Sequence, residues 1–548
     1  MITTPCPEGV AVTGGCLAEA TATPAWYQLA THSPDQPIQT PTPDAPHVIP
    51  TIRLDPYDYT VQEGESLATI GQKYNVAPLT IAEANQLPDP NALSVGQALV
   101  IPAPTPSGSA PDLKIIPDAE LVYSPSAIGF DIAAFIEAHD GYLKSYTEVV
   151  DGVTLDAGQI IYRVAVENSV NPRILIAALE YVGGWVTHPH PDELAQIYPL
   201  GYYDERKTGL YKQLSWAANE LNRGFYLHQV NGLAAFLLPD GEMIPLDKTT
   251  NSGTVGVQYL ASQIYTKEDW LTAISGNGMM QVYQDFFGYP FDYSLEGLIP
   301  SDLEQPLMAL PFEPETVWSF TGGPHGGWGD GSAWAAIDFA PPGEPMGCTL
   351  SSAWAVAVAE GDILYADQGA VILDVDGDGL MQTGWTVLYL HVDSEDRVKP
   401  GTHVLAGDRI GHPSCEGGLS SATHLHVARR YNGMWISADG NLPFELDGWV
   451  SSGTGTIYDG FLNAAAGCWR HTTVSVMTIK FNDKKGKALT RRRLMASLLL
   501  PVVLLSACTN DYVSLDAVIT PESTTVPVVQ LPTSAPTETV PEVLPMLP

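Results

Sequence analysis

The chain has 548 residues, a length that predicts three or four domains. Its hydrophobic fraction of 45% is ordinary for folded protein, and we expect a multidomain α+β chain. A formal net charge of −37 argues against nucleic-acid binding and against non-specific attraction to anionic polymers. Any polymeric partner must therefore be held by specific contacts.

Three tracts lack the hydrophobic pattern of a folded core. Residues 1–58 are rich in Pro, Thr and Ala and predict a disordered or extended linker. Residues 103–119, which begin APTPSGSAP, predict a second linker. Residues 509–548 form a Pro/Thr/Ser-rich tail with no core.

A compact unit is predicted between the first two tracts, at residues 59–102. It opens with a short strand, continues with two helices and closes with a second strand. The second helix is expected to pack through Leu79, Ile81 and Ala82. This βααβ order closely resembles the LysM carbohydrate-binding module over the whole segment.

The LysM resemblance implies that N-acetylglucosamine chains bind in a shallow groove between two loops. The expected glycan contacts are Gly64, Glu65, Ser66, Leu67, Asn91, Ala92 and Leu93. A scaffold that has lost its binding capacity is the alternative.

Residues 120–300 are predicted to be mainly helical. Apolar residues recur at helical spacing over 160–168 and 173–181. Asn171 and Pro172 together are typical of a helix start.

The segment NPRILIAALEYVGGW weakly resembles the catalytic helix of lysozyme-like lytic transglycosylases. That resemblance implies that Glu180 protonates a glycosidic oxygen. Tyr181 stands where the resemblance expects Ser, so a helical spacer is the favoured interpretation.

Short strands with Gly-rich turns begin at residue 305 and predict an antiparallel β domain over 305–460. The motif DVDGDG at 374–379 resembles the first half of a calcium loop. Trp385 stands where the last ligand of such a loop, a Glu, is expected. A hairpin turn is therefore the favoured interpretation.

Four residues of this domain have the chemistry of a metal site: His325, Asp338, His424 and His426. The Asp with two of the histidines supplies three ligands, which leaves a fourth position of a catalytic zinc open for water. The HxH spacing directs both of its histidines to one face of a strand. One histidine therefore stays beside the metal for acid–base chemistry.

These residues resemble the LytM/lysostaphin-type zinc metallopeptidases. The commoner H-x3-D pattern is absent, because Trp334 occupies the position four before Asp338. His325 lies 13 positions before Asp338, the spacing of the staphylolytic and β-lytic branch. LYLH at 388–391 completes the ordered set of motifs.

The resemblance implies zinc bound by His325, Asp338 and His426, with His391 and His424 as catalytic residues that face the substrate. One of these two would take a proton from the attacking water, and the other would stabilise the oxyanion. Which residue has which role stays open. The resemblance also implies a disulfide, formed by Cys348 and Cys415.

The motifs together predict a zinc endopeptidase that hydrolyses the peptide crosslinks of bacterial peptidoglycan. It would act outside the cell or in the cell envelope and be tethered to glycan strands by the LysM-like module. Two alternatives stay open: a catalytically silent wall-binding or amidase-activating module, and glycan cleavage by the helical region.

Residues 477–508 follow the order of a bacterial lipoprotein signal: a basic segment, an apolar run and LSAC, which ends at Cys508. Such signals begin proteins. The favoured interpretation is that residues 477–548 belong to a neighbouring lipoprotein, lipidated at Cys508, and contribute nothing to the peptidase fold. The alternative is a C-terminal membrane anchor through residues 494–507. A membrane contact is expected only through such a lipid or tail anchor.

Overall fold

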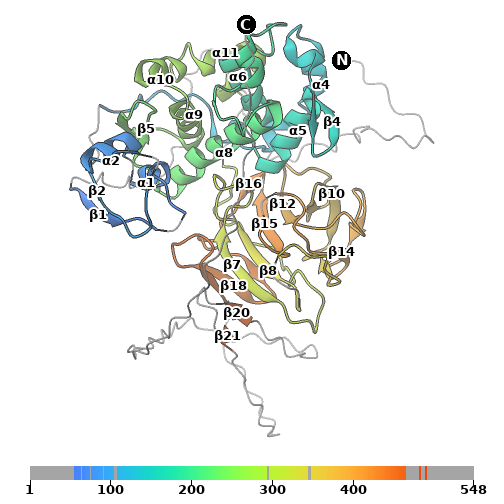
Figure 1. The fold of residues 1–548 in the computed structure, drawn as a ribbon. Coiled ribbons are helices and arrows are strands. Elements are labelled where there is room, and N and C mark those ends of the chain that lie inside the picture. The colour runs from blue at the N-terminus through green and yellow to red at the C-terminus, as the bar shows by residue number, and fades with distance from the viewer. Residues whose placement is uncertain are drawn as a thin grey trace, which may run out of the picture. The chain divides into compact units, whose positions relative to one another are not determined.

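The computed structural model describes most of the chain between the first linker and the predicted signal segment. Figure 1 shows the LysM-like module in blue, the helical region in cyan and green, and the β domain in yellow and orange. Among the described residues, no helix is both long enough and apolar enough to cross a membrane. The described residues are 55–464, except 63, 75, 91, 104–107, 293–294, 296, 344–346 and 419, together with 480–482 and 488–489.

The LysM-like module is a two-stranded antiparallel sheet with two helices between its strands. Its core is apolar and includes Ile70 and Ile81. Leu79 is 65% exposed, so its predicted packing role is wrong, because only Ile81 and Ala82 of the second helix point into the core. The elements are β1 Tyr57–Thr60, α1 Leu67–Tyr74, α2 Pro78–Ala84 and β2 Ala98–Ile101, so the first strand begins two residues before the predicted boundary.

The helical region contains mostly α-helices and two short hairpins. Polar side chains begin its central helices, and the predicted helix start at Asn171 and Pro172 is confirmed. Asp156 and Gln159 form a reciprocal capping box, and the Asn171 side chain accepts a hydrogen bond from Arg173 N just before Pro172. The elements are α3 Asp118–Leu121, α4 Ile132–Glu137, β3 Thr147–Val150, β4 Val153–Asp156, α5 Ala157–Asn168, α6 Pro172–Gly183, α7 Glu193–Ile197, α8 Leu210–Gln229, β5 Ala235–Leu237, β6 Met243–Pro245, α9 Ser252–Ser262, α10 Lys267–Ala273 and α11 Met279–Phe287.

The predicted linker 103–119 does not extend to residue 119 in the structure, because the helical region already begins at Ala110. Ala110 N donates to Pro245 O, and the side chains of Ile115 and Ile116 are buried in the core of the helical region. The Thr254 hydroxyl also accepts hydrogen bonds from the backbone of both isoleucines. The segment from Ala110 onward is therefore part of the helical region, because its apolar side chains complete that core.

The β domain is built on one large, mostly antiparallel sheet in the order β13-β10-β11-β12-β15-β8-β7-β20-β21. Its strands are β7 Ser319–His325, β8 Ala336–Ala340, β9 Ala355–Val356, β10 Gly361–Asp367, β11 Ala370–Asp374, β12 Trp385–Leu390, β13 His403–Val404, β14 Arg409–Gly411, β15 Leu425–Tyr431, β16 Met434–Trp435, β17 Glu445–Leu446, β18 Trp449–Gly453 and β19 Gly460–Ala464, followed by β20 Lys480–Asn482 and β21 Ala488–Leu489. The antiparallel pairing of β11 with β12 makes the DVDGDG segment a hairpin connection, as predicted.

Residues 477–548 were expected to add nothing to the peptidase fold, and for part of this segment the expectation is wrong. Strand β20 pairs in parallel with β7, and β21 pairs with β20. An open sheet edge offers unpaired backbone groups to any extended segment that reaches it. The predictions for Cys508, for the first 54 residues and for the 509–548 tail concern residues outside the described ranges.

Candidate functional site

Three neighbouring strands bring the predicted metal ligands to one face of the sheet. His426 on β15 is the direct cross-strand partner of Asp338 on β8. His325 at the end of β7 pairs with Ala336, two residues before Asp338. Directly opposed residues, and residues two positions away along a strand, share a face. The strand register therefore places all three side chains together.

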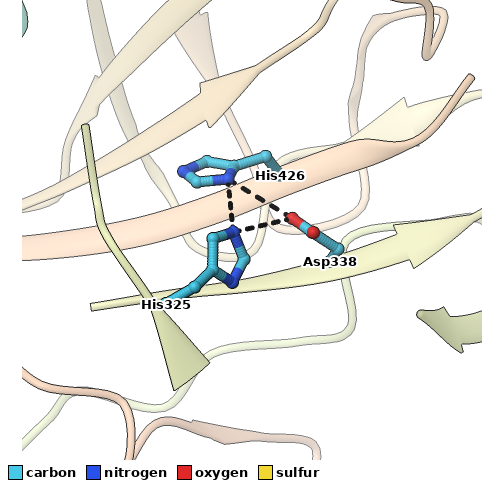
Figure 2. A group of neighbouring side chains, drawn as sticks. All are labelled: His325, Asp338 and His426. Atoms are coloured by element: carbon cyan, nitrogen blue, oxygen red, sulfur yellow. Dashed lines mark hydrogen bonds and ion pairs between the residues drawn. The ribbon is translucent and has the colours of Figure 1, made fainter. Parts of the chain in front are cut away.

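The three side chains converge through one atom each (Figure 2). His325 Nε2 lies 3.0 Å from His426 Nδ1. Asp338 Oδ1 lies 3.2 Å from the first nitrogen and 3.3 Å from the second. All three residues are buried, and together they are one group that could hold a metal ion.

Backbone carbonyls fix the tautomers of both histidines. His325 Nδ1 is 2.8 Å from Gly323 O, and His426 Nε2 is 3.0 Å from Gly327 O. Because a carbonyl oxygen only accepts, these ring nitrogens must donate. The opposite nitrogens, which face Asp338, are then left with lone pairs, the arrangement that a metal-ligating histidine requires.

The electrostatics favour an ionised carboxylate between the imidazoles. Burial alone would raise the pKa of Asp338, but without a metal the positive charge that the adjacent histidines carry when protonated, His325 above all, outweighs burial and holds that pKa well below its usual range. Burial alone would lower the pKa of His325, whereas the Asp338 carboxylate raises it overall. Burial dominates at His426 and lowers its pKa.

The donor set fits zinc. Zinc bonds of about 2.0–2.1 Å in a tetrahedral site put neighbouring ligand atoms roughly 3.3–3.4 Å apart, close to the separations of the three facing atoms. Among the described residues, Asp338 Oδ1 accepts no hydrogen bond although it is buried. When both imidazoles are neutral, two lone pairs and a carboxylate oxygen without a hydrogen bond thus point at one position, as a cation would require.

His391 and His424 lie beside this triad and outside it. Their ring centroids are 4.5 Å apart, and His424 Nε2 is 3.8 Å from Asp338 Oδ1. His391 Nδ1 donates to Glu416 O at 3.0 Å, and His424 Nδ1 donates to Ala422 O at 2.8 Å. In each neutral ring Nε2 therefore carries the lone pair.

Burial, reinforced by the neighbouring His424 and His426, lowers the pKa of His391 to about 3. His391 is thus neutral at pH 7. It follows β12 directly and has a left-handed backbone with φ of 66°. Strand β12 therefore ends at Leu390, and the turn that follows brings the His391 ring next to that of His424.

A disulfide joins two loops that lie beside His391 and His424. Cys348 and Cys415 are bonded, with a Cα–Cα distance of 5.7 Å. Next to the bridge, Glu416 O accepts from His391 Nδ1, and Thr423 N donates to Gly347 O. The pairing implied by the sequence resemblance thus lies at the edge of the site.

The sequence missed one aromatic neighbour of the triad. The Tyr458 ring stacks on the His325 imidazole at a centroid distance of 4.2 Å and an interplanar angle of 24°. Tyr458 lies 133 positions after His325, in the turn between β18 and β19. Neither the periodicity of the hydrophobic residues nor the spacing of the motifs in the sequence predicts such a contact.

The second acidic group, Asp374, Asp376 and Asp378, stays with its hairpin. Asp374 is buried and accepts hydrogen bonds from Gly377 N and Gly379 N, while Asp378 accepts from Leu380 N. The hydrogen bonds of these carboxylates thus stabilise the turn, which agrees with the hairpin interpretation.

The LysM-like loops carry most of the predicted glycan contacts. Glu65 turns inward and accepts hydrogen bonds from Tyr59 Oη and Gln62 N. Leu67 is buried in the core, so its side chain is not accessible to a glycan in this structure. Gly64, Ser66 and Ala92 are accessible, Leu93 is half-buried against the core, and Asn91 lies outside the described residues.

The hydrogen bonds of Glu180 indicate a structural role for this residue. Its carboxylate accepts hydrogen bonds from Val186 N and Thr187 N at 2.8 and 3.1 Å, and from the Thr187 hydroxyl. These bonds hold the turn after α6 against the end of the helix. This geometry favours the spacer interpretation over a glycan-cleaving acid, which would need a free proton to donate.

Comparisons with known proteins agree with the motifs. Residues 59–102 match the LysM domain, and residues 114–300 match the N-terminal domain of LasA. Protease LasA of Pseudomonas aeruginosa is 24% identical over 350 residues, which cover 59% of this chain and 75% of LasA. The N-acetylmuramoyl-L-alanine amidase XlyA of Bacillus subtilis is 35% identical over 60 residues, 11% of this chain and 20% of the amidase.

Two solved structures are also similar. The deep-sea M23 metalloprotease pseudoalterin is 21% identical and covers 29% of this chain and 91% of its own, with a TM-score of 0.24. The catalytic domain of lysostaphin from Staphylococcus simulans is 25% identical and covers 22% and 89%, with a TM-score of 0.17. The predicted resemblance to a LytM/lysostaphin-type peptidase with a LysM module is confirmed: the chain is similar to protease LasA and matches both the LysM domain and the LasA N-terminal domain.

Proposed function

We propose that this chain is a zinc endopeptidase that binds peptidoglycan and hydrolyses its peptide crosslinks. The observation that carries the proposal is the convergence of His325 Nε2, Asp338 Oδ1 and His426 Nδ1 within 3.3 Å of one another. The relationship to protease LasA supports peptide hydrolysis, and the LysM domain supports a cell-wall substrate.

The three triad residues would hold the zinc. When bound, zinc supplies a Lewis acid that polarises the scissile carbonyl and lowers the pKa of water. His391 is neutral at pH 7 and offers Nε2 as an acceptor, so it can take a proton from the attacking water. His424 lies closer to Asp338 and has the same free nitrogen, so either histidine can serve as the base. The other would face the developing oxyanion.

The envelope or the cell exterior is the compartment that this proposal requires. Peptidoglycan is the partner, through glycan strands at the LysM domain and through peptide crosslinks at the β domain. The Cys348–Cys415 bridge supports the same location, because structural disulfides persist in oxidising compartments.

Digestion of purified sacculi with mass analysis of the fragments tests the proposal. We expect one zinc per chain and fragments with new amino termini from cut crosslinks. His426→Ala should lose both the metal and the cleavage. His412 is a half-buried histidine outside the triad whose ring contacts Trp354, and His412→Ala should keep both. New reducing ends without new amino termini would point to glycan cleavage, and absence of both zinc and products would point to a silent binding module.

A further inference from the structure

The segment between the first two ligands, His325 and Asp338, contacts the helical region. We call residues 326–335, which follow His325 and precede β8, the ligand loop. Gly327 in this loop is the residue whose carbonyl oxygen accepts from His426 Nε2. The loop is closed internally by Gly327 N to Ala333 O and by Trp328 N to the Ser332 hydroxyl, each at 3.0 Å. The position of that carbonyl therefore depends on where the whole loop is held.

Helix α8 holds the outer end of the ligand loop. The Asn219 side chain accepts from Gly331 N and donates to Asp330 Oδ1, both at 2.8 Å. Arg223, one turn further along α8, forms an ion pair with the same carboxylate oxygen at 2.7 Å. A bidentate amide and a largely buried guanidinium thus grip two consecutive loop residues.

The inner end of the loop rests on Trp435, which is itself fixed by the helical region. Trp435 N donates to the Tyr226 hydroxyl at 3.0 Å, and Trp435 Nε1 donates to Asn168 O at 3.2 Å. The Arg430 guanidinium lies 3.8 Å from the Trp435 ring centroid. It also donates to Val166 O and Glu167 O, at the carboxyl end of α5.

Two glycines allow this close approach. A Cβ on Gly327 would overlap the Trp435 ring, and a Cβ on Gly331 would overlap the backbone carbonyl of Asn219. The Gly-rich sequence of the loop is therefore explained by what it packs against. The 13-residue separation of His325 from Asp338 supplies the length that reaches α8.

We propose that Asn219 and Arg223 of the helical region are positioning residues for the metal site. They hold the ligand loop so that the Gly327 carbonyl binds the Nε2 proton of His426, which directs the Nδ1 lone pair toward His325 and Asp338. The inference rests on the proposed zinc site and assigns the LasA-type N-terminal domain a part in building it. Changes to partners of metal-ligating histidines typically cost about 10–100-fold in metal affinity. Asn219 and Arg223 act one residue further out, so about 10-fold is expected for each.

The test uses the full chain and the variants Asn219→Ala, Arg223→Ala and Arg223→Lys. Lys212→Ala is the matched control, because Lys212 is an exposed cation on the same helix. Two measurements are made: the zinc dissociation constant by chelator competition, and the tautomer of His426 in the metal-free protein from imidazole ¹⁵N shifts. We expect about 10-fold weaker zinc binding and a mixed His426 tautomer in both alanine variants. Arg223→Lys should recover part of the affinity, and Lys212→Ala should match the parent protein.

Each other outcome is decisive. Parent-like zinc affinity and a single tautomer in both alanine variants would overturn the positioning role. Loss of the fold by circular dichroism in both would also overturn it, because a positioning contact can be removed without unfolding the chain. A parent protein that binds no zinc would refute the proposed function itself, which distinguishes that failure from the failure of this inference.

Discussion

Replacement of His391 tests the proposed division between metal ligands and catalytic histidines. His391 lies outside the ligand group, with its ring centroid 6.2 Å from that of His426, so His391→Ala should retain zinc. A positioned acid or base contributes roughly 10²–10⁴-fold. At about 1.36 kcal/mol for each factor of ten, the variant should lose about 2.7–5.4 kcal/mol of transition-state stabilisation.

The backbone at this position calls for a second variant. His391 has a left-handed φ of 66°, which Asn tolerates better than most residues. Loss of the imidazole also removes the hydrogen bond to Glu416 O, for which about 1 kcal/mol of stability is expected. His391→Asn therefore keeps the turn while it removes the imidazole.

The assay measures kcat and KM on a soluble peptide crosslink, with zinc content determined on the same samples. Both His391 variants should keep one zinc and lose turnover with little change in KM, and His424→Ala should behave similarly. His412→Ala controls for loss of a half-buried imidazole elsewhere. A zinc-free His391→Ala protein, or one with parental turnover, would refute the assignment.

Three other expectations follow from the same structure. Deletion of residues 57–102 should weaken binding to insoluble peptidoglycan while cleavage of a small soluble peptide stays nearly unchanged, because tethering raises only the effective substrate concentration; equal losses in a sedimentation assay and a peptide assay would contradict this. The folded-state pKa of His391, about 3, is below its ordinary value of 6.5, so the unfolded chain binds more protons between these values and stability is lost as pH falls through this window. Metal-free protein should lose up to about 1.4 kcal/mol of unfolding free energy per pH unit from this group, and urea titrations of His391→Asn should show a correspondingly flatter profile. Removal of the Cys348–Cys415 bridge, whose cysteines are 67 positions apart, should cost about 4 kcal/mol by loop entropy and reduce turnover more than zinc content; a Cys348→Ser/Cys415→Ser protein with parental melting temperature and kcat would argue against it.

Local signals explain which structural elements were predictable. The helix start at Asn171 and Pro172 is encoded within a few residues, as is the hairpin around DVDGDG. Whether an apolar side chain is exposed or buried depends instead on how the segments pack in the folded protein. Leu79 was expected in the core and is exposed, whereas Ile115 and Ile116 were assigned to a linker and are buried. An apolar side chain in a short segment shows that it can be buried, but not which neighbour will cover it.

The sequence by itself determined the candidate ligands, because His325, Asp338, His391, His424 and His426 stand in an ordered set of motifs whose donor atoms suit zinc. Only the tertiary structure decided how these residues relate to one another. The register of β7, β8 and β15 brings three donor atoms within 3.3 Å, and the Gly323 and Gly327 carbonyls select the nitrogen that each histidine presents. The contact of Asn219 and Arg223 with the ligand loop spans more than 100 positions. Side-chain pattern along a chain carries information about secondary structure and donor chemistry, whereas contacts at such separations arise only when strands pair and helices pack.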